Sequence, residues 1–224
     1  MASVPLIARE GAVAVVEIGD SSLDALVTAL STLTADVRAV LLRLPSSLPD
    51  ATGSGRDIAA VEALPLPTVA LLGTRCSGLA LDLALCCDIR IAPTDAVVSA
   101  TGPAAGTPPV AGTVARLVRT TGQGVARDML ITGRPVAAPD ALAWGLVTRL
   151  SSSAPTDALE LATTLAALSP EALGATKQLA LGASEDSYEA GLAAELSLWR
   201  TVRDGANAQE GLSAFAEKRD PRFT

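Results

Sequence analysis

The sequence predicts an α/β fold in which a core of alternating strands and helices is followed by a region of helices. Short apolar runs alternate with amphipathic segments through the first half of the chain, whereas helical spacing dominates the second half. No Pro/Gly/Ser-rich linker divides the 224 residues, and a content of 49% hydrophobic residues is enough for one sizeable core. We therefore expect one domain, with an α/β core over 1–150 and a helical region over 151–224.

The expected elements follow from two periodicities. Runs rich in Val, Leu and Ile predict strands at 13–18, 37–44, 68–72, 88–92, 96–100 and 146–150. Apolar residues that recur every three or four positions predict helices at 21–33, 112–120, 123–131, 137–144, 155–168, 170–181 and 185–203. Ser21 or Ser22 is the expected N-cap of the first helix. The last helix carries an apolar stripe, expected to be either core or a subunit contact, made of Leu192, Leu196, Trp199 and Val202.

The composition excludes several classes of function. A formal charge of −7 and only 2% aromatic residues argue against binding of nucleic acid. The complete absence of histidine removes Ser-His-Asp and Cys-His catalysis and makes the common zinc sites improbable, so no metal is expected. Three cysteines, no apolar run long enough to span a membrane and no basic-then-apolar leader indicate a protein of the reducing cytoplasm.

Three glycine-bearing stretches of irregular backbone lie beside the regular elements, at 51–64, within 73–92 and at 99–117. A glycine turn at the start of a helix presents unpaired backbone N–H groups, and two such groups that converge form an oxyanion hole. The alternative is that these glycines only make turns. A single carboxylate, Asp82, lies among leucines just after Gly78 in "GTRCSGLALDLALCCDIRIA", and packing alone gives no reason for an acid there.

Four stretches together resemble the crotonase superfamily, the enoyl-CoA hydratase/isomerase family. They are "VRAVLL" followed by "SGRDI", then "LPTVALL…SGLALDLALCCDIRIAPTDA", "DMLITGRPVAAPDALAWGLVTRL" (128–150) and "EGLSAFAEKRDPRFT" (210–224). The resemblance covers nearly the whole chain, with the motifs in the family's order. It implies a spiral of ββα units with a C-terminal helical region that mediates homotrimers, often paired into hexamers.

The resemblance also implies an acyl-CoA thioester as ligand, with CoA entering as part of the substrate and no separate cofactor. The thioester carbonyl would receive hydrogen bonds from the backbone N–H groups of Arg56 and Leu79, and Asp82 matches the first of the two glutamates that hydratases of the family use. The positions that would line the substrate beside these three are Gly55, Gly78, Ala80 and Gly102.

The sequence departs from the family pattern at several of these positions. The second hydratase glutamate falls on Gly102, and no acid lies between Asp95 and Asp128. Asp82 is one methylene shorter than glutamate, and leucine and alanine follow Gly78 where the family commonly has glycines. The segment between Asp57 and Pro65 is contracted, and Ala59 stands where a lysine near the CoA phosphates is frequent.

We therefore expect an acyl-CoA enzyme that stabilises a thioester enolate, isomerase-like or decarboxylase-like rather than an efficient hydratase. Two alternatives stay open: a non-catalytic acyl-CoA-binding or assembly homologue with a degenerate site, and a biosynthetic enzyme for decarboxylation or C–C cleavage. Asp82 is either catalytic or an idle polar residue, and Asp57 is interpreted as a helix cap. Cys76 is interpreted as a core thiol; the arginines that could meet CoA phosphates, or simply lie on the surface, are Arg56, Arg75 and Arg116.

Overall fold

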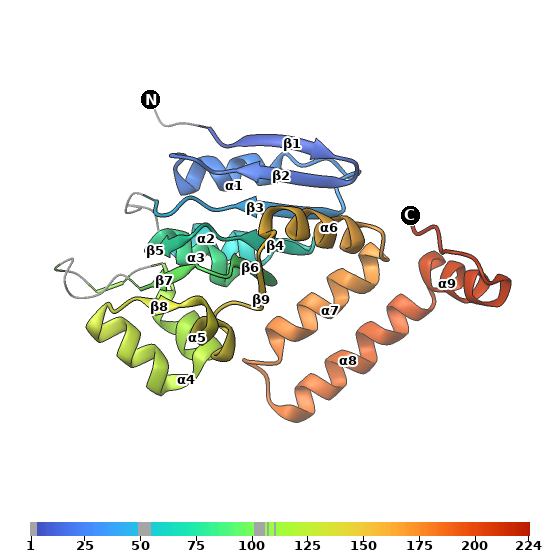
Figure 1. Ribbon diagram of the computed structural model, residues 1–224. Helices are drawn as coiled ribbons and strands as arrows, with labels where there is room; N and C mark the ends of the chain where they lie inside the picture. Colours follow the sequence, from blue (N-terminus) through green and yellow to red (C-terminus); the bar gives the residue numbers. More distant parts are fainter. Residues whose placement is uncertain (1–3, 49–54, 101–105, 107, 110) are drawn as a thin grey trace.

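The computed structural model describes residues 4–48, 55–100, 106, 108–109 and 111–224 (Figure 1). Its strands are Leu6–Glu10 (β1), Val13–Glu17 (β2), Ala39–Arg43 (β3), Thr68–Leu71 (β4), Arg75–Ser77 (β5), Ile89–Pro93 (β6), Val97–Ser99 (β7), Val136–Ala137 (β8) and Arg149–Ser151 (β9). Its helices are Leu23–Ser31 (α1), Gly55–Glu62 (α2), Leu79–Cys86 (α3), Thr113–Thr132 (α4), Ala138–Ala143 (α5), Ala154–Ala166 (α6), Pro170–Gly182 (α7), Tyr188–Arg203 (α8) and Ala206–Glu217 (α9).

The main sheet has six strands in the order β1-β2-β3-β4-β6-β9. Every neighbouring pair is parallel except β1 with β2, which are joined as an antiparallel hairpin through Gly11 at φ 60°. The parallel strands are apolar on both faces because helices cover both sides, so their side chains alternate between two separate cores. β2, β3 and β4 are accordingly buried along almost their whole length.

The two cores have different partners. On one face, side chains such as Val16 and Leu42 pack with α1, α2 and α3. On the other face, side chains such as Val15 and Leu41 pack against α6, which lies across the sheet (Figure 1). The residues of α6 that face the strands recur every fourth position and are all small: Ala154, Ala158, Ala162 and Ala166. Their size lets the helix axis approach the sheet closely.

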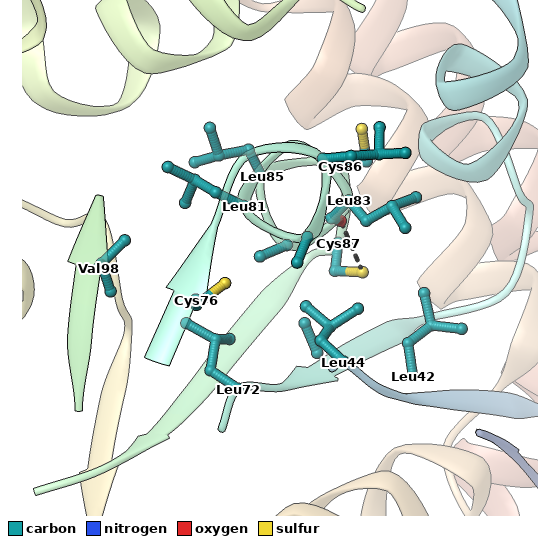
Figure 2. Packing of buried hydrophobic residues seen from close by; sticks show 14 of the residues in the cluster. Leu42, Leu44, Leu72, Cys76, Leu81, Leu83, Leu85, Cys86, Cys87 and Val98 are labelled. Atoms are coloured by element: carbon teal, nitrogen blue, oxygen red, sulfur yellow. Dashed lines mark hydrogen bonds between the residues drawn. The ribbon is translucent and has the colours of Figure 1, made fainter. Parts of the chain in front are cut away.

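A second sheet of three strands, in the order β5-β7-β8, packs beside α3. All eight residues of α3 are buried, Asp82 included. Figure 2 shows why, because Leu81 and Leu85 point to one side of the helix and Leu83 to the other, and all three belong to the apolar core. The Cys87 thiol closes the C-terminal end of this helix by donating to the Leu83 carbonyl oxygen at 3.3 Å. A helix with no solvent-facing side is a rigid support for whatever its N-terminus holds.

The predicted α/β architecture, a core of strands and helices followed by a C-terminal helical region, is confirmed. Ser22 caps α1, its Oγ accepting from Ala25 N at 3.2 Å. The helices predicted at 112–120 and 123–131 both lie within α4, which consists of two helical segments joined at Gly122, where φ is 78° and ψ is 164°, so the predicted break is confirmed. Elements that were not predicted are β1, β5, β8 and α9. The division at residue 150 stays a prediction.

The last helices, α7, α8 and α9, extend away from the sheets (Figure 1). The end of the chain contacts the residue before β3 again. Asn207, at the start of α9, is buried and pairs with the backbone of Thr224 in both directions, each bond measuring 2.9 Å. Arg38, just before β3, donates to the carbonyl oxygens of Phe223 and Leu168, each at 2.8 Å. One guanidinium thus ties the sheet to the end of α6 and to the last turn of the chain.

The apolar stripe of α8 is not core. Leu192, Leu196 and Trp199 are each about half exposed, at 48%, 49% and 56%. Of the two expectations for this stripe, burial within the chain is therefore wrong, and a contact with another subunit is the one that remains.

Candidate active site

The centre of the candidate site is the carboxyl group of Asp82, in the first turn of α3. The residue is only 6% exposed, and its Oδ1 atom is buried without a hydrogen-bond partner among the described residues. Burial raises the pKa of this carboxyl from 3.8 to about 6, while a hydrogen bond with Thr113 and the charge of Arg116 oppose that rise. The group is therefore mostly ionised at neutral pH but protonated over a range where ordinary aspartates are not.

The start of α3 has the geometry that the glycine turn predicts. Gly78, the N-cap, has φ 56° and ψ −134°, a combination that residues with a Cβ avoid, and among the described residues no side chain caps it. The first N–H groups of an α-helix have no partner within the helix, so those of Leu79 and Ala80 are available to an oxyanion. The Leu79 side chain is 7% exposed and packs into the hydrophobic core, which accommodates its volume.

The second predicted donor, Arg56, lies in the first turn of α2. This helix begins at Gly55, so Asp57 lies in its first turn, and its interpretation as a helix cap stays a prediction. α2 and α3 pack against each other, which puts both predicted donors in the first turns of neighbouring helices. Gly102 lies outside the described residues, so the expected loss of the second carboxylate stays a prediction from the sequence.

Arg116 is paired within the protein. Its side chain is 11% exposed, and its Nη2 and Nε atoms donate to Glu62 Oε2 at 2.7 and 3.2 Å. Its Nη1 atom donates to the Ala111 carbonyl oxygen at 2.8 Å. The guanidinium is thus largely buried and paired within the protein, so Arg116 is not an arginine of the open surface. Arg75 is exposed, in the second sheet.

Thr113 and Glu62 were not identified from the sequence. Thr113 is buried at the start of α4, and Glu62 is the last residue of α2. A buried arginine needs an acidic partner, which was the one available signal for Glu62. The sequence gives no means of choosing Glu62 among the many acids of the chain. Thr113 gave no signal because threonine is ordinary near a helix start.

The thiols are not candidates for nucleophiles. Burial raises the pKa of Cys76 to about 12, with the nearby charge of Asp82 acting in the same direction. Burial likewise raises the pKa of Cys87 to about 12. A thiol with such a pKa is almost entirely protonated at neutral pH, which agrees with the interpretation of Cys76 as a core residue. The described residues contain no group of three acids and cysteines placed to hold a metal ion.

The family model for enoyl-CoA hydratase/isomerase matches residues 52–224. The chain belongs to this family. Among curated relatives of this family member, methylglutaconyl-CoA hydratase 1 of Pyricularia oryzae is 37% identical over 183 residues, and 2,3-dehydroadipyl-CoA hydratase of Escherichia coli is 35% identical over 170 residues. Each match covers 74% of this chain but 52% and 66%, respectively, of the relative, so the chain spans about half to two thirds of their lengths.

Solved structures of other proteins share the fold of this family member over nearly its whole length. An enoyl-CoA hydratase from Polaromonas sp. JS666 superposes with a TM-score of 0.88 at 22% identity, covering 99% of this chain and 100% of that one. DspI of Pseudomonas aeruginosa superposes with a TM-score of 0.86 at 27% identity, covering 98% and 96% of the two chains. No helix in the described part of the chain is long and apolar enough to cross a bilayer.

Proposed function

We propose that this enoyl-CoA hydratase/isomerase family member moves a proton on an acyl-CoA thioester, with Asp82 as the base and the N–H groups of Arg56 and Leu79 as the oxyanion hole. The observation that carries the proposal is the Asp82 carboxyl: an acid buried within an apolar helix, with one oxygen lacking a partner among the described residues. Such a group costs stability and is typical of a functional site. The curated relatives named above are hydratases of CoA thioesters, which supports the substrate class.

The proposed step is the removal of the proton on the carbon next to the thioester carbonyl. Asp82 Oδ1 takes the proton, the electron pair of the broken C–H bond forms the C=C bond of the enolate, and the carbonyl oxygen takes the negative charge. The N–H groups at the starts of α2 and α3 stabilise that charge, since helix N-termini favour anions. Return of the proton to a different carbon completes an isomerisation.

Addition of water requires more than this site offers. Asp82 is shorter than glutamate by one methylene, and a misplacement of about 1 Å costs on the order of 10²-fold in rate. The counterpart of the second hydratase glutamate is Gly102, and loss of a general acid or base costs a further factor of roughly 10²–10⁴. We therefore propose proton transfer, with isomerase-like or decarboxylase-like chemistry, over efficient hydration.

The test is the exchange of the α-protons of butyryl-CoA in D2O, followed by mass spectrometry of the recovered thioester. We expect enzyme-dependent incorporation of deuterium, together with hydration of crotonyl-CoA that is far slower than the exchange. A hydration kcat near about 10³ s⁻¹, the upper range for enzymes, would contradict the proposed preference. Binding of acyl-CoAs without exchange or turnover would instead favour the non-catalytic alternative.

We also propose that the exposed face of α8 and α9 binds further copies of this chain, as the resemblance to the family implies. The face carries apolar side chains that are at least 48% exposed: Tyr188, Leu192, Leu196, Trp199, Leu212 and Phe215. Exposed apolar residues gathered on two helices are typical of subunit contacts.

Light scattering after size exclusion should therefore give a homotrimer or hexamer. Leu196→Glu on α8 should yield smaller species, because it places a charge in the contact. Leu6→Glu provides the matched control, since Leu6 is 67% exposed on the edge strand β1 and should tolerate the charge. A monomeric wild-type protein, or an unchanged Leu196→Glu assembly, would refute the proposal.

A further inference from the structure

Arg116 joins three parts of the chain at the edge of the candidate site. It lies on α4 one turn after Thr113, which is close enough to Asp82 for its side chain to lower the pKa of that carboxyl. Its fork of donors reaches Glu62 at the end of α2 and the Ala111 carbonyl oxygen just before α4. The first turn of α2 carries Arg56. The guanidinium therefore connects the helix of one predicted donor with the first turn of α4, which carries Thr113.

The backbone before α4 is shaped to receive this guanidinium. Ala111 has φ 65° and Gly112 has φ 86°, so two successive residues adopt the left-handed conformation, which costs energy at the alanine. A Cβ at Gly112 would lie 2.5 Å from Arg116 Nη1, closer than any real contact. The strained backbone at Ala111 and the absence of a side chain at Gly112 have one explanation: both make room for the Arg116 guanidinium.

From this geometry we infer that Arg116 is a positioning residue of the site: held by Glu62 and the Ala111 carbonyl, it fixes the first turn of α4 and keeps a positive charge near the Asp82 carboxyl. This inference rests on the proposed function of Asp82 as the base. It assigns Arg116 a role through Asp82 and Thr113, with no contact to substrate.

The charge effect can be isolated because, among the described residues, few titratable groups act on Asp82. Those that do are Arg116 from α4, Cys76 from β5 and Cys86 on α3 itself. Burial raises the pKa of both thiols far above neutrality, so they stay protonated between pH 4 and 9. Glu62 acts through its ion pair with Arg116. A change in the Asp82 titration after substitution of Arg116 therefore reports on the guanidinium.

The experiment compares Arg116→Met, which removes the charge and the fork, with Arg116→Lys, which keeps the charge but cannot bridge both acceptors. The readouts are butyryl-CoA exchange and the titration of Asp82 by ¹³C NMR of aspartate-labelled protein, with Asp82→Asn identifying the signal. Arg116→Met should raise the pKa of Asp82 and lower kcat for exchange about 10-fold to 100-fold, with little change in KM. Arg116→Lys should lower kcat while leaving the pKa near its wild-type value.

The matched control is Arg119→Met, on the same helix. Arg119 pairs with Glu185 at 3.3 Å, but both side chains are more than half exposed, so its loss should change neither readout. If Arg116→Met is too unstable to study, Glu62→Gln, which keeps an oxygen acceptor, should retain most of the exchange that Glu62→Ala loses. An unchanged Asp82 titration and rate in folded Arg116→Met would overturn the inference. If the wild-type protein shows no exchange, the proposed function fails, whereas the NMR titration still decides the role of Arg116.

Discussion

Asp82→Asn is expected to lower the rate of butyryl-CoA α-proton exchange by a factor of roughly 10²–10⁴, the usual loss when a general base is removed. Asparagine has nearly the shape of aspartate, and its amide oxygen can still accept the hydrogen bond of Thr113, so the local packing should survive. The amide cannot take up the proton, because it has no basic lone pair at neutral pH. Affinity for butyryl-CoA should change little, since the oxyanion donors belong to the backbone.

The pH profile sharpens this prediction. The pKa of Asp82 is raised to about 6, so the wild-type exchange rate should rise with pH up to that value and level off above it, as the carboxyl becomes ionised. Asp95→Asn provides the matched control, because Asp95 is an exposed acid in the turn between β6 and β7. Equal rates in wild-type and Asp82→Asn protein at pH 8 would show that Asp82 is an idle residue.

Asp82→Asn should also stabilise the folded protein relative to the wild-type protein at neutral and alkaline pH. The pKa of Asp82 is raised from 3.8 to about 6 because burial disfavours the charged form. The native protein therefore binds more protons than the unfolded chain between these values, and the free energy of unfolding falls as pH rises through this window. Two pKa units correspond to about 3 kcal/mol, which is lost by pH 7 and is fully present below pH 4.

Urea unfolding at several pH values measures this effect. The free energy of unfolding of Asp82→Asn minus that of the wild-type protein should increase by about 2.5 kcal/mol from pH 4 to pH 8, because only the wild-type carries the titrating group. Taking the difference removes the other carboxylates, which titrate alike in both proteins. A difference that does not depend on pH would mean that Asp82 has an ordinary pKa and is better solvated than its burial indicates.

The parts of the fold that local patterns encode were predictable. The parallel strands are continuous runs of Val, Leu and Ile, and α1 and α6 have clear helical periods, so these elements occur where expected, within a few residues. β1 was missed because its LIARE sequence is mostly exposed at the edge of the sheet and carries no apolar pattern. β5 and β8, with three and two residues, are defined only by their partners in the second sheet.

The candidate site was predictable in its backbone but not in its side-chain contacts. The positive φ of Gly78 follows from the local sequence, because glycine before a helix is typical of such a turn. The contact of Asp82 with Thr113 joins residues 31 positions apart, and Arg116 reaches Glu62 across 54 positions. Neither pairing has a local signature, since both depend on how α2, α3 and α4 pack.

The bridge made by Arg38 bears on the order of events during synthesis. Its partner Phe223 follows 185 residues later, so a ribosome that adds about 5–20 residues per second needs roughly 10–40 s to deliver it. The sheet can form well before that time, while the Arg38 guanidinium is still hydrated and its hydrogen bond to the Phe223 carbonyl oxygen has not yet formed. The orientation of the terminal helices is therefore settled only after the nascent domain has already collapsed.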